Sequence, residues 1–71
     1  WKYFVGFQVL DINHGKLGEI VNVDESTMNV LFAIEQEDGE EILLPAHEEF
    51  ILKIEKKKRV ITVAVPEGLL D

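Results

Sequence analysis

The chain has 71 residues, a net charge of −7 from fourteen acids against seven bases, and no cysteine. Its length accommodates one small domain, and the absence of cysteine excludes a disulfide framework and a thiolate metal site. Phosphate contacts dominate nucleic-acid binding, so the acidic excess disfavours direct RNA or DNA contact and favours a basic protein partner.

The sequence carries no recognisable membrane or export signal. No apolar run approaches the roughly 20 residues that a transmembrane helix needs, and no basic start precedes an apolar stretch as in a signal peptide. We therefore expect a cytoplasmic protein without a membrane partner. Because the chain begins at Trp1 and not at methionine, we also expect it to be part of a longer protein.

Alternating apolar residues predict strands along almost the whole chain. The first strand is expected over residues 5–12 and the second over 17–24, joined into a hairpin by the glycine-containing turn 13–16. Strict alternation would place one set of side chains of the second strand on one face and the other set opposite. These sets are Leu17, Val21 and Val23 against Gly18, Ile20 and Asn22.

A second hairpin is expected next along the chain. Strands at 28–35 and 42–44 flank Asp38–Gly39, the strongest short hairpin signal available. Pro45 ends the second of these strands, because proline cannot donate a hydrogen bond to a ladder. One short helical turn is expected at 46–49.

The last two strands are expected at 50–55 and 59–65, with a lysine-rich turn between them at 56–58. Beyond them, the apolar pair Leu69 and Leu70 is expected to fold back onto the barrel. About six short antiparallel strands at roughly ten-residue spacing predict an all-β barrel or sandwich. Residues 1–4 are interpreted as the end of an interdomain linker, and residues 5–71 as the barrel domain.

Nothing in the sequence favours catalysis. The single serine, Ser26, has no nucleophile motif around it, and His14 and His47 stand far apart without a metal-ligand partner at helical spacing. The adjacent Glu48 and Glu49 are interpreted as a solvated pair, because neighbouring side chains point apart. We therefore expect a protein that is not an enzyme and binds no metal or cofactor.

Acidic residues gather around the predicted Asp–Gly turn, with five carboxylates within seven residues: Glu35, Glu37, Asp38, Glu40 and Glu41. We call this group the acidic tip. Such charges can keep a sheet edge from pairing with other chains, or they can steer a basic protein toward the domain. The second interpretation makes Glu37, Asp38 and Glu40 candidate partner-binding residues.

The remaining surface candidates are aromatic, aliphatic or basic. Trp1 and Tyr3 can cap the barrel or anchor a protein interface, and Leu69 and Leu70 would add apolar contact. The basic segment Lys56–Arg59 is interpreted as a solvated turn, with a weak contact to RNA phosphate as the alternative.

Several short motifs follow one another in a distinctive order. Phe-Val-Gly-Phe-Gln-Val at 4–9 precedes Gly-Lys-Leu-Gly-Glu-Ile at 15–20, then Gly-Glu-Glu-Ile-Leu-Leu-Pro at 39–45 and finally Val-Pro-Glu-Gly-Leu-Leu-Asp at 65–71. Together they resemble, over essentially the whole chain, the C-terminal PRC-barrel domain of the RimM family of ribosome maturation factors.

The resemblance implies a small PRC barrel that acts as a non-catalytic assembly factor for the small ribosomal subunit. It implies binding of the ribosomal protein uS19 and of the immature small subunit, in support of 16S rRNA processing and head-domain maturation. Direct rRNA contact by this domain is not expected. The alternative is a stand-alone PRC-barrel adaptor or regulatory interaction module, because a fold alone does not fix a function. The candidate partner-binding residues are Trp1, Tyr3, Glu37, Asp38, Glu40, Leu69 and Leu70.

Overall fold

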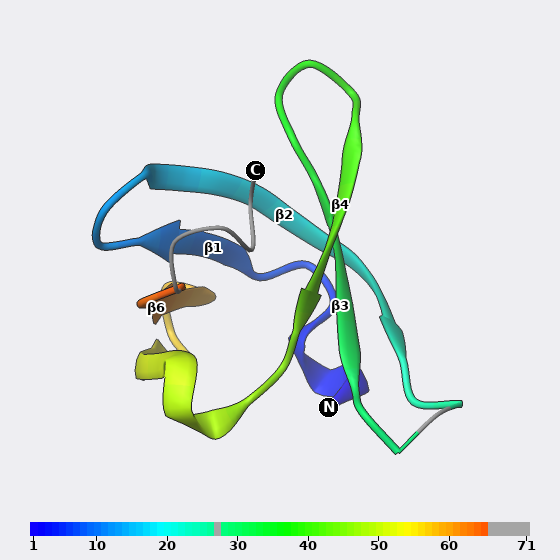
Figure 1. Cartoon of the computed structure of the whole chain (residues 1–71). Coiled ribbons are helices and arrows are strands. Elements are labelled where there is room, and N and C mark those ends of the chain that lie inside the picture. The colour runs from blue at the N-terminus through cyan, green and yellow to red at the C-terminus, as the bar shows by residue number, and fades with distance from the viewer. Residues whose placement is uncertain (27, 66–71) are drawn as a thin grey trace.

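The computed structural model describes residues 1–26 and 28–65, which form one six-stranded sheet with two short 3-10 helices (Figure 1). The all-β prediction is confirmed. The elements in chain order are η1 (Lys2–Phe4), β1 (Gln8–Asp11), β2 (Gly15–Asp24), β3 (Leu31–Glu35), β4 (Glu41–Pro45), η2 (Glu48–Phe50), β5 (Ile51–Glu55) and β6 (Val60–Val63). The expected helical turn is η2, which begins two residues later than predicted. Leu69 and Leu70 lie outside the described residues.

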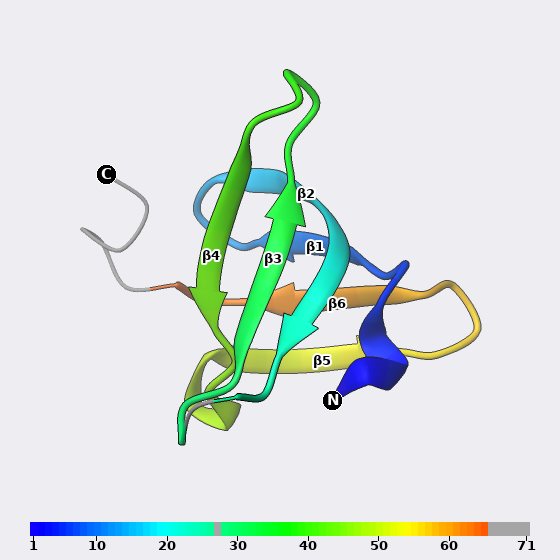
Figure 2. The ribbon, with the colours of Figure 1, turned by 90° about the vertical axis from the view of Figure 1, so that its right-hand side faces the viewer.

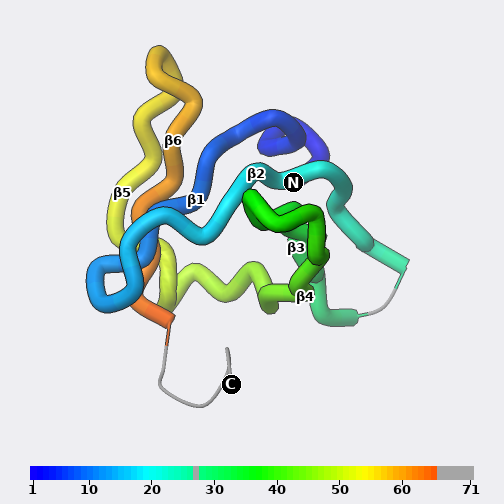
Figure 3. Tube along the Cα trace, turned by 90° about the horizontal axis from the view of Figure 1, so that it is seen from above, coloured from blue at the N-terminus to red at the C-terminus, as the bar shows by residue number. Residues whose placement is uncertain are grey.

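The sheet curls around a single apolar core. Its strand order is β4-β3-β2-β1-β6-β5, and in Figure 2 β3 and β4 run steeply across the direction of β5 and β6. Seen from above in Figure 3, the strands follow one another around a common centre. The buried apolar residues that fill this centre are Phe7, Val9, Leu17, Ile20, Val23, Phe32, Ile34, Leu44, Ala46, Ile61, Val63 and Val65.

One strand pair departs from the antiparallel prediction. β1 and β6 pair in parallel, whereas the other four ladders among the described residues are antiparallel. A series of hairpins alone would make β1 and β6 run in opposite directions, because each hairpin reverses the chain. The segment 46–50 between β4 and β5, however, is not a hairpin. It carries the chain across to the far edge of the sheet, so that β6 returns in the same direction as β1.

Two bulges in β2 overturn the predicted alternation of its side chains. The register shifts against β1 between Val9 and Leu10, and against β3 between Ile20 and Asn22. Each bulge inserts one extra residue and reverses which side chains face the core. As a result Ile20 is buried, whereas Val21, expected on the core face, is 38% exposed.

The predicted turn at Asp38–Gly39 is confirmed. It connects β3 to β4, with Gln36 donating its N–H to the Glu40 carbonyl at 2.8 Å and Gly39 donating to the Gln36 carbonyl at 2.9 Å. Gly39 has φ +87°, a left-handed conformation that glycine adopts without steric cost. This turn raises the acidic tip to one extremity of the molecule (Figure 2).

Candidate protein-binding surface

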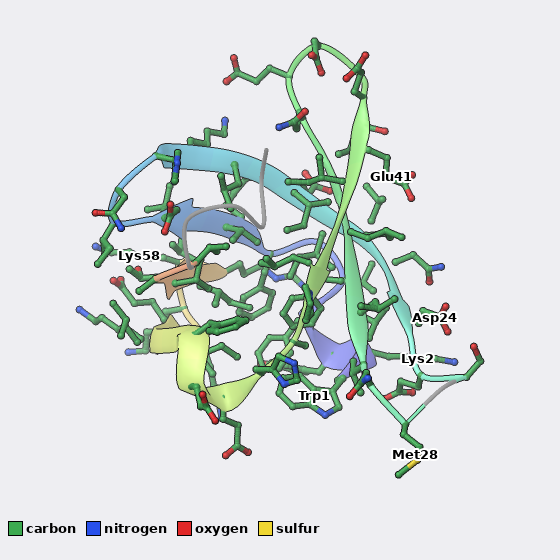
Figure 4. All side chains as sticks on the ribbon, viewed as in Figure 1. Trp1, Lys2, Asp24, Met28, Glu41 and Lys58 are labelled. Carbon is green, nitrogen blue, oxygen red and sulfur yellow. The ribbon has the colours of Figure 1, made fainter. Side chains whose placement is uncertain are left out.

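Trp1 lies at the opposite end of the molecule from the β3–β4 turn, beside η1 (Figure 4). Its indole ring contacts the ring of buried Phe32 at a centroid distance of 5.8 Å, edge-on, and that of Phe4 at 6.0 Å. Phe4 in turn packs against buried Phe7 at 5.2 Å. Trp1 nevertheless remains 39% exposed. The structure therefore presents a large aromatic side chain at the surface and holds it by aromatic contacts to the core.

Trp1 lines two hollows at the surface. One, of about 440 Å³, is lined by Trp1, Phe4, Glu48, Ile51 and Ile54. The other, of about 400 Å³, is lined by Trp1, Met28, Asn29, Val30, Ala46, His47, Glu48 and Glu49. Trp1 and Glu48 line both hollows; the first adds mainly apolar side chains to them, and the second adds a further glutamate.

The carboxylates of Glu48 and Glu49 stand at this surface without a salt bridge or side-chain hydrogen bond to any described residue. Both belong to η2, which begins directly after His47, and the His47 ring packs edge-on against Phe50 at 5.3 Å. Two unpaired negative charges beside an exposed tryptophan are suited to a basic, partly apolar partner.

The acidic tip is partly neutralised by its own surroundings. Lys16 pairs with Glu37 at 3.5 Å, and the Asp38 carboxylate accepts the N–H of Glu40 at 2.9 Å. The Asp38 side chain therefore also stabilises the turn that carries it. The β3–β4 turn, which carries Glu37, Asp38 and Glu40, lies far from Trp1 (Figure 4).

The structure thus divides the predicted site residues into two groups. Trp1 and Tyr3 lie together, with Tyr3 exposed and in ring contact with Phe4 and Phe7, while the acidic tip lies at the other end. Sequence reasoning missed Glu48, because nothing in the sequence indicates that the turn before β5 meets the first residue of the chain. The only available signal was two adjacent acids in a short turn after Pro45.

Local contacts hold part of the basic turn between β5 and β6. Lys53 and Lys58 pair with Glu55 at 3.3 and 3.6 Å, and the hydrogen bond and charge of Lys53 hold the pKa of Glu55 below its usual value. Arg59 adopts a left-handed φ of +56°, and its guanidinium lies 6.0 Å from the centroid of the Phe7 ring. These contacts are those of a solvated hairpin turn, as one of the two interpretations expects.

Asp11 is the single buried charged residue among those described, at 3% exposure. Its Oδ1 accepts the N–H of Val65 at 3.1 Å, and its Oδ2 contacts Nδ1 of His14. Burial acts to raise the pKa of Asp11, but the contact with His14 and the hydrogen bond from Val65 outweigh it and lower the pKa. Asp11 thus links the end of β1 to the chain just after β6 and stabilises the fold.

The described residues contain no group of three or more side chains suited to binding a metal ion. Ser26 donates from Oγ to the Asp24 carboxylate at 2.6 Å, so its hydroxyl belongs to a local turn. None of the helices among residues 1–26 and 28–65 is long and apolar enough to cross a membrane.

The family model of the RimM PRC barrel domain matches residues 1–69. The chain belongs to the RimM PRC-barrel family. Among the curated proteins, the ribosome maturation factor RimM of Phocaeicola vulgatus is 71% identical over 70 residues, and that of Bacteroides thetaiotaomicron is 59% identical over 71 residues. These alignments cover 99% and 100% of this chain but 40% of each relative. The chain thus spans about two fifths of the length of the RimM proteins that it matches.

The fold has a solved counterpart in the same family. A crystal structure of a Pseudomonas aeruginosa RimM, described as a 16S ribosomal RNA processing protein, superimposes with a TM-score of 0.78 at 22% identity. The match covers 93% of this chain and 43% of the other. The predicted family membership and the predicted PRC-barrel fold are therefore both confirmed.

Proposed function

We propose that this chain is a non-catalytic binding domain that acts in maturation of the small ribosomal subunit in the cytoplasm. Its direct partner is the ribosomal protein uS19 on the immature subunit, and through that contact it supports 16S rRNA processing and head-domain maturation. The relatives are named ribosome maturation factors, and the family supplies the biological setting for a surface whose chemistry favours a basic protein.

The charge of the domain supports a protein partner over an RNA partner. The first fifty residues hold eleven acids and two bases, and the last twenty-one hold five bases and three acids. An RNA phosphate backbone would be repelled by most of this surface. A basic ribosomal protein that has not yet met its rRNA would instead be attracted to it, and its charge would be shielded in the complex.

The observation that carries the proposal is Trp1, an exposed tryptophan that is held by aromatic contacts and lines two hollows, beside carboxylates without an ion pair to any described residue. Tryptophan is among the residues most enriched in the energetic centres of protein interfaces. Because Phe32 and Phe4 already hold the ring, a partner would lose little conformational entropy in ordering it.

A titration of purified uS19 against the domain tests the proposal. Trp1→Ala is expected to weaken binding by about tenfold or more, as removal of an interface anchor does. Leu43→Ala removes an apolar side chain of β4 that is more exposed than Trp1 and serves as the control, expected to leave the affinity unchanged. Absence of uS19 binding at micromolar concentration, or tighter binding of 16S rRNA than of uS19, would refute the proposal.

A further inference from the structure

The indole of Trp1 is arranged as a fixed platform. Phe32 meets it edge-on at an interplanar angle of 63°, and Phe4 meets it at 51°, so the neighbouring rings restrict its rotation from the core side. A planar cation can stack on such a ring, and tryptophan is the aromatic side chain that binds cations best.

The chemistry of the two hollows at this platform differs. Besides the shared Trp1 and Glu48, one hollow is lined by the apolar side chains of Phe4, Ile51 and Ile54. The other adds His47 and Glu49 to Glu48, alongside residues 28–30 and Ala46, and neither carboxylate has a described cationic partner. A ligand that fills both must therefore combine a cationic group with an aliphatic one.

We propose that the two hollows lined by Trp1 bind an arginine side chain of the partner together with an aliphatic neighbour. The guanidinium stacks on the indole of Trp1 and donates to the carboxylate of Glu48, while the aliphatic side chain packs against Phe4, Ile51 and Ile54. The inference rests on the proposed function, since it specifies which chemistry of a basic protein this surface recognises.

Arginine fits better than lysine for geometric reasons. Its guanidinium is planar, stacks on aromatic faces and presents paired N–H donors that match the two oxygens of one carboxylate. The lysine ammonium is a compact, strongly hydrated charge that does not stack, so it would lose more hydration on entering a hollow of about 400 Å³. An anionic ligand such as phosphate is disfavoured by the two glutamates.

The test uses the 71-residue chain itself, in which Trp1 is the only tryptophan. Fluorescence emission and the indole N–H resonance of Trp1 are followed during titration with the peptide acetyl-Leu-Arg-Leu-amide. The matched peptides replace arginine by citrulline, which is nearly isosteric but uncharged, or by lysine. The arginine peptide is expected to bind about tenfold more tightly than the citrulline peptide, as loss of a charge-assisted hydrogen bond and a cation–π contact would give.

Paired variants separate the proposed contact from general electrostatics. Glu48→Gln is expected to weaken arginine-peptide binding part of the way to the citrulline level, because the guanidinium still stacks on Trp1, and to leave citrulline-peptide binding unchanged. Glu37→Gln makes the same change of charge at the acidic tip and is expected to change neither. The inference would be overturned if the citrulline peptide or the lysine peptide bound as tightly as the arginine peptide. It would also be overturned if the two variants had equal effects on arginine-peptide binding. Thermal melts confirm that both variants are folded.

The same variants distinguish failure of the inference from failure of the proposed function. If uS19 binds and Glu48→Gln has no effect on that binding or on the arginine peptide, the inference fails and the proposed function stands. If the arginine peptide binds as expected and uS19 does not, the arginine site stands and uS19 is the wrong basic partner.

Discussion

Replacing Asp11 by alanine should be one of the most damaging single changes in this domain. The carboxylate is almost completely buried and is the hydrogen-bond acceptor for the N–H of Val65, a residue that is itself buried. Alanine leaves that N–H without a partner, at a cost of about 1–3 kcal/mol. Loss of the contact with half-exposed His14 adds about 1 kcal/mol, reduced by solvent screening.

The expected loss is therefore about 2–4 kcal/mol in the free energy of unfolding. In a chain of this size that corresponds to a drop of roughly 10 °C or more in the melting temperature. Urea titration measures the free-energy change, and Asp24→Ala is the control. Asp24 also has a pKa held low by hydrogen bonds from Ser26, but it is exposed, so its loss is expected to change the free energy of unfolding very little. Equal losses for the two variants would refute the reasoning.

The pH dependence of stability tests the role of Asp11 independently. The pKa of Asp11 is lower in the folded protein than in the unfolded chain, so ionised Asp11 contributes stability at pH values above its unfolded pKa. That contribution is lost as the pH falls through the lower, folded pKa. The stability difference between the wild-type protein and Asp11→Asn should therefore shrink as the pH falls below about 5. A difference that grows on acidification would contradict the assignment.

Three further experiments test the bulged strand and the acidic tip. Gly18→Ala should destabilise the fold by more than about 2 kcal/mol in urea titration, because a Cβ would lie 2.2 Å from the Glu35 carbonyl oxygen at a φ of +147°. Ile20→Ala should cost about 2–5 kcal/mol and Val21→Ala less than about 1, whereas equal costs would contradict the bulged register. Reversing the three central acids of the acidic tip to lysine should slow association with uS19 and weaken its salt dependence, and unchanged kinetics would exclude a steering role.

Local patterns in the sequence were sufficient for the strands and the turns. The period-two alternation predicted six strands, and Asp38–Gly39 marked the second hairpin. The bulges at Leu17 and Val21 were not predictable, because they depend on how β2 pairs with strands on both sides. The parallel β1–β6 pair likewise depends on the path of the chain between β4 and β5, where no hairpin signal stands.

The candidate site was only half predictable for a related reason. Trp1 and Tyr3 stand out by residue type. Glu48 matters because the fold places it at the same two hollows as Trp1, and no local spacing in the sequence encodes that proximity. Conversely, the acidic tip stands out by charge density in the sequence, although the fold removes it from the aromatic cluster and pairs Glu37 with Lys16.

The acidic tip and Glu48 lie far apart, and this separation gives them different roles in binding. The molecule measures about 30 × 28 × 26 Å, and the Debye length is roughly 8 Å at physiological ionic strength but roughly 30 Å at 0.01 M. A partner seated on Trp1 would thus be affected by the acidic tip at low salt and scarcely at all at physiological salt. Glu48, within the contact, should influence dissociation at both. If charge reversal at the tip still slows association at physiological salt, the partner must extend over the β3–β4 hairpin as well as over Trp1.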